Sequence, residues 1–113
     1  MTEQILNLIS AGEKYLANKI PLLLLHGVDP SGACSCNNKT CPAPGKHPVR
    51  GDHEKNQIND VGQLKLLLAS DRLHNLAAWI QKDSDLFVVD VDPRNGGFES
   101  FQRLSSQANN MFP

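Results

Sequence analysis

The sequence predicts an α+β fold, and three observations lead to that prediction. Two segments carry apolar residues at helical spacing, over residues 4–18 and from about residue 60 to residue 70. Three short apolar runs, at residues 20–25, 76–80 and 86–92, have the length and composition of strands. With 113 residues, of which 40% are hydrophobic, the chain is long enough for one core and too short for two. We therefore predict a single domain over residues 1–113.

The first two predicted elements are a helix and a buried strand. Over residues 4–18 the apolar side chains fall on one helical face, and Thr2 is placed to cap the first turn. Residues 20–25 form a short apolar run between polar neighbours, which is typical of a strand inside a core.

Residues 26–56 show almost no periodicity and predict a long loop. They contain Pro30, Pro42, Pro44 and Pro48, four glycines and every cysteine of the chain. A loop of this length is uncommon inside a small domain, and such loops are usually functional.

The second half of the chain predicts a helix, a hairpin and a further helix. Asn59 or Asp60 caps a helix that runs to about Ser70. The runs 76–80 and 86–92 are predicted to pair as a β-hairpin, joined by the polar residues 81–85. Gly97 then opens a last helix with Phe98, Phe101 and Leu104 on one side.

Charge and composition exclude several classes of protein. The formal net charge is -1, from 11 basic and 12 acidic residues, so the chain has no polybasic patch for strong nonspecific nucleic-acid binding. No signal peptide is recognisable, and the longest apolar run is too short to span a bilayer. An odd number of clustered cysteines argues for a reducing compartment, so we expect a cytoplasmic protein without membrane contact.

Asp90 and Asp92 end the last predicted strand and are candidate metal ligands. At this spacing two side chains leave the same face of a strand, about 6.6 Å apart along it. Neighbouring carboxylates repel unless a cation or a proton lies between them, and Mg²⁺ or Mn²⁺ suits such oxygens. A pair of turn and cap aspartates after a buried strand is an equally good interpretation of the residues alone.

Three cysteines and a histidine in the long loop predict a zinc site. Cys34, Cys36, Cys41 and His47 lie within one short segment, and zinc prefers four such ligands in a tetrahedron. His53 and His26 compete with His47 for the fourth position, and three unconnected surface thiols are the alternative. Since the loop is poor in apolar residues, a bound metal would supply its cross-link, so we predict a zinc-binding loop over residues 30–55.

Four motifs in a fixed order resemble the N-terminal portion of bifunctional primase-polymerase domains, in the archaeo-eukaryotic primase superfamily. The motifs are Cys34-Ser-Cys36, Cys41-Pro-Ala-Pro-Gly-Lys-His-Pro48, Asn75-Leu-Ala-Ala-Trp79 and Phe87-Val-Val-Asp-Val-Asp-Pro-Arg-Asn-Gly-Gly97. The resemblance covers roughly residues 4–104 and implies a partial primase-like α+β domain with a zinc-binding loop. Members of this family are common in phages, plasmids and mobile elements.

The resemblance implies the chemistry of nucleotidyl transfer. It assigns Asp90 and Asp92 as catalytic ligands of Mg²⁺ or Mn²⁺, where two ions about 3.5–4 Å apart would clamp an incoming nucleoside triphosphate. The reaction is in-line attack of a primer 3′-oxygen on the α-phosphorus, so DNA and nucleoside triphosphates are the implied partners. The resemblance also supports a structural Zn²⁺ at the three cysteines and His47.

Five further residues are candidates for nucleotide binding. Asn95, Gly96 and Gly97 can offer backbone donors to a phosphate at the start of the last helix, although a plain turn explains them equally well. Arg94 adjoins the aspartates and either contacts the triphosphate or pairs with a carboxylate. Lys46 faces either a phosphate or solvent.

The sequence departs from the family pattern after Asp92. In the family a histidine motif and a third metal-binding carboxylate follow the aspartate pair, and neither has a counterpart here. We therefore expect a fragment or a reduced form that is inactive or severely impaired alone. Whether the chain is an enzyme is left open. The alternative is a non-catalytic regulatory protein that uses the zinc loop to bind a protein or nucleic-acid partner, including the remaining half of such a domain.

Overall fold

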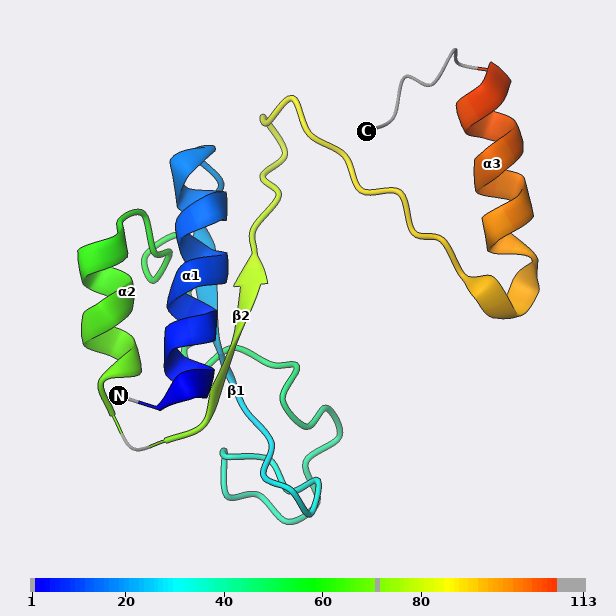
Figure 1. Ribbon diagram of the computed structural model, residues 1–113. Coiled ribbons are helices and arrows are strands. Elements are labelled where there is room, and N and C mark those ends of the chain that lie inside the picture. The colour runs from blue at the N-terminus through cyan, green and yellow to red at the C-terminus, as the bar shows by residue number, and fades with distance from the viewer. Residues whose placement is uncertain (1, 71, 108–113) are drawn as a thin grey trace.

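The computed structural model describes residues 2–70 and 72–107 and shows mixed helices and strands, which confirms the predicted α+β class (Figure 1). The elements, in chain order, are α1 (Glu3–Ala17), β1 (Leu22–His26), α2 (Val61–Leu68), β2 (His74–Ala78), the 3₁₀ turn η1 (Pro93–Asn95) and α3 (Gly97–Gln107). Within the described ranges, none of the helices has the length and apolar character that crossing a bilayer requires.

Both predicted helix caps are formed. The Thr2 hydroxyl accepts a hydrogen bond from the Ile5 N–H at 3.3 Å, and the Asp60 carboxylate accepts one from the Gln63 N–H at 2.9 Å. Each bond satisfies a donor that the first turn of a helix leaves without an intrahelical partner. Asp60 is therefore the N-cap of α2, which settles the choice between Asn59 and Asp60.

The strand β1 is bonded along both of its edges. It pairs antiparallel with β2, with Leu24 opposite Leu76. On its other edge, Leu22 forms a bridge with Ile58 and Leu25 forms one with Pro48. Two parts of the chain beyond β1 thus return to it, one from inside the long loop and one from just before α2.

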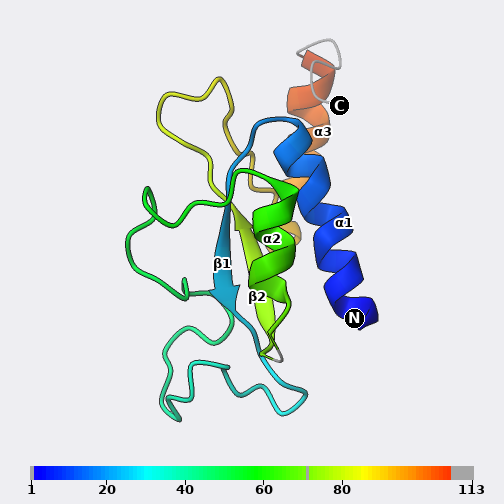
Figure 2. The same cartoon turned by 90° about the vertical axis from the view of Figure 1, so that its left-hand side faces the viewer.

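The helices α1 and α2 pack on the same face of the two-stranded sheet (Figure 2). The core consists of Ile9 from α1, Leu22 from β1, Leu64 and Leu68 from α2, and Ile58. Ile58 and Leu64 are fully buried although neither belongs to the sheet. The bridge at Ile58 therefore closes the core at the point where the long loop ends.

The predicted hairpin is wrong, because residues 86–92 form no strand in the structure. The partner of β2 is β1. The turn that follows β2 is closed locally, since the Gln81 carbonyl accepts hydrogen bonds from the Ser84 N–H at 3.1 Å and from the Ser84 hydroxyl at 2.8 Å. Residues 81–85 also lack the glycine or asparagine that tight hairpin turns favour. The chain therefore leaves the sheet instead of folding back on it (Figure 1).

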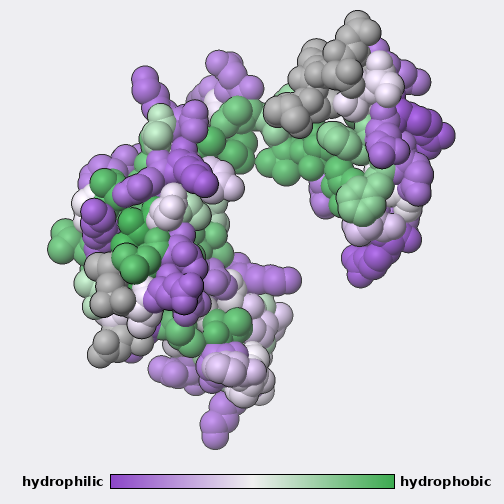
Figure 3. Space-filling view, viewed as in Figure 1, coloured by the Kyte–Doolittle hydropathy of each residue, from purple (hydrophilic) through white to green (hydrophobic). Residues whose placement is uncertain are grey.

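The C-terminal part of the described chain lies apart from this core. Residues 86–89 form no regular secondary structure, and the side chains of Phe87 and Val88 are each 74% exposed. The helix α3 contacts η1 and stands away from α1 and α2 in Figure 1. Its Phe98 and Leu104 are also exposed, and apolar side chains gather on one side of this part in Figure 3.

Candidate metal centre

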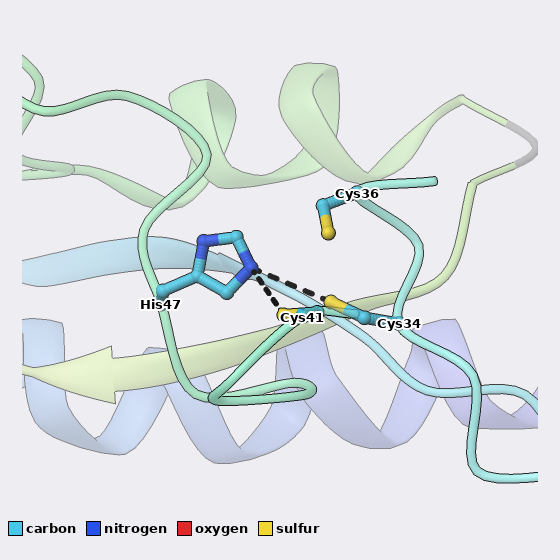
Figure 4. A group of neighbouring side chains, drawn as sticks. All are labelled: Cys34, Cys36, Cys41 and His47. Atoms are coloured by element: carbon cyan, nitrogen blue, oxygen red, sulfur yellow. Dashed lines mark hydrogen bonds between the residues drawn. The ribbon is translucent and has the colours of Figure 1, made fainter. Parts of the chain in front are cut away.

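The side chains of Cys34, Cys36, Cys41 and His47 converge in the long loop (Figure 4). Their Sγ and imidazole nitrogen atoms all lie within 4.8 Å of one another. Among the residues that the structure describes, no other group of three or more Cys, His, Asp or Glu side chains gathers in this way. Three thiols and an imidazole form a donor set that can hold a metal ion, and zinc is the ion that such donors favour.

The spacing of these atoms fits a tetrahedral ion. His47 Nε2 lies 3.5 Å from Cys34 Sγ and 3.4 Å from Cys41 Sγ. Bond lengths of about 2.3 Å to sulfur and about 2.0–2.1 Å to nitrogen place such a pair about 3.5 Å apart in a tetrahedron. The His47 nitrogen therefore stands at the distances from Cys34 and Cys41 that zinc ligation would give.

Backbone donors favour the ionised form of Cys34. The Gly45 N–H donates to Cys34 Sγ at 3.4 Å. Burial of Cys34 opposes ionisation, but bonds from the backbone of Gly45 and Cys36 and from the His47 side chain outweigh it and lower the pKa of Cys34 to about 6. Since metals bind the thiolate, these donors also favour metal binding.

Cys41 behaves in the opposite way. A backbone bond from Ala43 favours its thiolate, but burial, the Cys36 and Cys34 side chains and the charge of Cys34 together raise the pKa of Cys41. Neighbouring thiolates repel one another, so ionising all of them is unfavourable unless a cation lies among them. A metal ion at the centre of the cluster would remove this conflict.

The fold fixes His47 and Gly45 against the sheet. The His26 N–H donates to the His47 carbonyl at 3.0 Å, which ties the histidine to the end of β1. The Gly45 carbonyl accepts a bond from the Asn75 side chain at 3.0 Å, which ties the other side of the loop to β2. Gly45 has φ +70, and an added Cβ would lie 3.0 Å from Asn75 Nδ2, so its conformation and its surroundings both favour glycine.

The two rival histidines lie outside the cluster. His26 Nδ1 lies 3.3 Å from the Ser35 hydroxyl, and burial together with the charges of His47, His74 and Arg72 lowers its pKa. The ring of His53 meets Trp79 edge-on at 6.2 Å between ring centroids. Of the three candidates for the fourth ligand position, the structure therefore brings only His47 to the cysteines.

Asp90 and Asp92 do not form part of a comparable cluster among the described residues. Asp90 is exposed, whereas Asp92 caps η1 and is half-buried. One Asp92 oxygen accepts bonds from the Arg94 N–H at 2.9 Å and from Arg94 Nε at 3.3 Å, and the other accepts one from Asn95 Nδ2 at 3.1 Å. In this arrangement the Asp92 carboxylate serves the turn that follows it.

Two of the three predicted phosphate donors are engaged within the same turn. The N–H groups of Asn95 and Gly97 both donate to the Asp92 carbonyl, at 3.3 and 2.9 Å. Gly96 has φ +72, and a Cβ on Gly97 would clash with the Asp92 backbone, so both glycines are needed for this tight turn. The side chain of Lys46 is exposed on the metal loop, far along the chain from these residues.

Sequence reasoning missed the residues that support the cluster. Ser35 and Asn75 both belong to motifs that were recognised, yet neither was assigned a role. In the structure the Ser35 hydroxyl accepts a bond from the Gly27 N–H at 3.0 Å, and Asn75 holds Gly45. Their residue types carry no signal for this function, because small polar residues are common in any loop.

Comparison with known proteins gives one match. The family model described as bifunctional DNA primase/polymerase, N-terminal, matches residues 13–113. This range includes the metal cluster and the Asp90–Gly97 segment. No curated protein and no solved structure matches the chain significantly.

Proposed function

Because the chain belongs to the family of bifunctional DNA primase/polymerase N-terminal domains, we propose that it is a metal-stabilised part of a primase-polymerase module that acts in DNA replication. The observation that carries the proposal is the joint presence of the family match and a Cys₃His cluster with the spacing of a tetrahedral ion. The partners of such a module are DNA and nucleoside triphosphates. In this proposal a phage, a plasmid or another mobile element encodes it.

In this proposal Zn²⁺ occupies the cluster and has a structural role. The ligands come from the loop of residues 30–55, which places two buried residues, Cys34 and Gly45, and otherwise little apolar surface against the sheet. Four bonds to one ion would hold Cys34, Cys36 and Cys41 to His47, and thereby to β1. Zinc would thus replace the hydrophobic contacts that this loop lacks.

Asp90 and Asp92 are proposed as the Mg²⁺ or Mn²⁺ ligands of the nucleotidyl-transfer site, with Arg94, Asn95, Gly96, Gly97 and Lys46 contacting the nucleotide. The resemblance of the Phe87–Gly97 segment to the family motif supports this assignment. Binding a cation through Asp92 requires that its carboxylate exchange its bonds to Arg94 and Asn95. Because the histidine motif and the third metal-binding carboxylate of the family have no counterpart in these 113 residues, we propose that they are inactive or severely impaired as a polymerase on their own.

A binding role without catalysis is the second candidate. It is favoured by the contrast between the two sites, since the cysteine cluster is assembled whereas the aspartates are not gathered with a third ligand among the described residues. A protein of this kind would present the zinc loop to a protein or nucleic-acid partner.

Metal analysis tests the proposed zinc site. Protein purified without chelator should contain about one zinc ion per chain, because the four ligands form one tetrahedral set. Cys36→Ser, which changes one of the four ligands, should lose most of this zinc. Ser31→Ala, in the same loop, serves as the control. Zinc near zero in the unaltered chain, with all three thiols freely titratable, would refute the site.

Calorimetric titration with Mn²⁺ tests the carboxylate site. Asp90→Asn and Asp92→Asn should each weaken Mn²⁺ binding, while Asp83→Asn, an exposed carboxylate in the preceding turn, should leave it unchanged. Equal binding by all four proteins contradicts the assignment. Primer extension with Mn²⁺ addresses catalysis separately, since robust synthesis by the 113-residue chain contradicts its proposed inactivity.

A further inference from the structure

We infer that His26 and Ser35 are positioning residues of the metal centre, which hold its ligands in place without binding the ion. The inference rests on the proposed zinc site and adds to it the support that keeps the site assembled. It concerns a role that neither residue type reveals in the sequence.

The bend from Cys34 to Cys36 needs outside support. Only one residue, Ser35, separates the two cysteines, whereas paired zinc ligands usually have at least two residues between them. A spacer of one residue leaves little chain with which to turn two Sγ atoms toward one ion. The conformation of Ser35 therefore decides whether both sulfurs reach the centre.

Ser35 is fixed to the end of β1 by three contacts. Its N–H donates to the Gly27 carbonyl at 2.8 Å, and its hydroxyl accepts a bond from the Gly27 N–H at 3.0 Å. The same hydroxyl lies 3.3 Å from His26 Nδ1. Since the backbone and the side chain of Ser35 are both engaged, the bend between the cysteines is held in one orientation.

His26 connects this bend to the fourth ligand. Its backbone N–H donates to the His47 carbonyl at 3.0 Å, and the two imidazole rings lie 4.5 Å apart at an angle of 42°. One residue thus touches both halves of the site, the cysteine bend through Nδ1 and the His47 side through its backbone and ring. His26 consequently helps to fix the distance between the cysteines and His47.

Gly27, to which Ser35 is bonded, is closely packed against the start of β2. A Cβ on Gly27 would lie 2.7 Å from the Leu73 carbonyl carbon and 2.8 Å from the His74 nitrogen, so the chain entering β2 presses directly on Gly27. Ligands held on a rigid support need less rearrangement when the ion binds, and the ion leaves less readily. The expected effect of His26 and Ser35 is therefore on the retention of metal and on the geometry around it.

The test compares five variants in the full 113-residue chain. Ser35→Ala and His26→Phe remove the contact between the hydroxyl and the imidazole, and His26→Phe still keeps a ring beside His47. Ser35→Thr keeps the hydroxyl, and His26→Asn keeps a polar atom near the position of Nδ1. Ser31→Ala is the matched control, because the Ser31 hydroxyl donates to Asp29 at 2.6 Å in the same loop.

Two readouts are followed, the rate of zinc transfer to a chelator and the visible spectrum of the Co²⁺-substituted protein. Ser35→Ala and His26→Phe should release zinc about 10–100-fold faster, the range typical of lost outer-shell support. Their Co²⁺ bands should shift while the metal content stays near one ion per chain. Ser35→Thr and His26→Asn should restore slow release, and Ser31→Ala should match the unaltered chain.

The outcomes separate this inference from the proposed site. If the unaltered chain binds zinc but Ser35→Ala and His26→Phe release it no faster than Ser31→Ala, the positioning role is wrong and the zinc site stands. If the unaltered chain binds no zinc, both are wrong. Loss of the helical circular dichroism signal in Ser35→Ala but not in Ser35→Thr would assign the residue to general stability instead, which also overturns the inference.

Discussion

Gly45 joins the metal loop to the sheet through its backbone alone. Its N–H donates to Cys34 Sγ, and its carbonyl accepts from Asn75. Its positive φ is a conformation that other residues adopt at a cost of about 1–2 kcal/mol. Gly32 provides a comparison, since it also has a positive φ, of +88, but no atom lies within 4 Å of where its Cβ would be.

Gly45→Ala should therefore cost more stability than Gly32→Ala. We expect Gly32→Ala to lower the free energy of unfolding by about 1–2 kcal/mol through backbone strain. Gly45→Ala should exceed this and also speed zinc release, because Cβ crowding displaces the donor to Cys34. Urea unfolding followed by circular dichroism measures the first effect, and chelator transfer measures the second. Equal losses in the two variants contradict the contact argument.

Cys34 makes the metal-free chain sensitive to pH. Its pKa is lowered from 9.0 to about 6, so the stabilisation from its thiolate is fully present above pH 9.0 and is lost as the pH falls through about 6. In metal-free protein, ultraviolet thiolate absorbance should show one step near pH 6, which Cys34→Ser removes. In urea this step should move up to the ordinary pKa of a thiol. A folded chain with no step below pH 8 contradicts this expectation.

At the scale of elements, α2 shows that apolar residues on one helix can have opposite roles. Leu64 is completely buried against α1 and β1, and an added Cβ on Gly12 of α1 would lie 2.6 Å from its Cδ2. Leu66, two residues further on, is 81% exposed. The two leucines are the same residue type on one helix and differ in burial, which makes them a matched pair.

Leu64→Ala should lower the free energy of unfolding by about 2–5 kcal/mol, because it opens a cavity in a closed core. Leu66→Ala should change it by less than about 0.5 kcal/mol, as expected for an exposed position. Urea titration of the helical signal measures both. A large loss in Leu66→Ala would mean that this face of α2 is covered in solution.

At the scale of the whole molecule, the chain is less compact than a single domain of its length. Its radius of gyration is 16.7 Å, compared with about 13 Å expected from the usual scaling. Residues 86–107 lie away from the sheet (Figure 1) and leave apolar residues exposed (Figure 3). An exposed apolar surface of this kind is a common site of protein contact.

Phe87→Ser should consequently have little effect on stability, with a change below about 0.5 kcal/mol in the unfolding of α1 and α2. It should reduce the binding of a hydrophobic dye, because Phe87 is 74% exposed. Dye fluorescence and urea unfolding are measured on the same samples, with Leu64→Ala as the destabilised reference. A loss of several kcal/mol in Phe87→Ser would show that residues 86–89 pack against the core.

The sequence predicted the local features well, because they depend on neighbouring residues. Thr2 and Asp60 cap helices through residues three positions away, and the cysteines meet His47 within fourteen residues of one loop. The pairing of residues 76–80 with 86–92 was wrong, since strand pairing depends on which edge is available and where a turn sends the chain. A run of apolar residues shows strand propensity and does not name the partner.

By itself the sequence determined the α+β class, the approximate starts of the helices, the family and the three cysteines of the metal cluster. Only the tertiary structure decided that β1 is bonded along both edges, that His47 and not His26 or His53 reaches the cysteines, and that His26, Ser35 and Gly45 hold the site. It also showed that the Asp92 carboxylate serves its own turn. The physical reason is that spacing along the chain records which groups are near in sequence, whereas hydrogen bonds between β1, β2 and the loop join residues that are far apart in it.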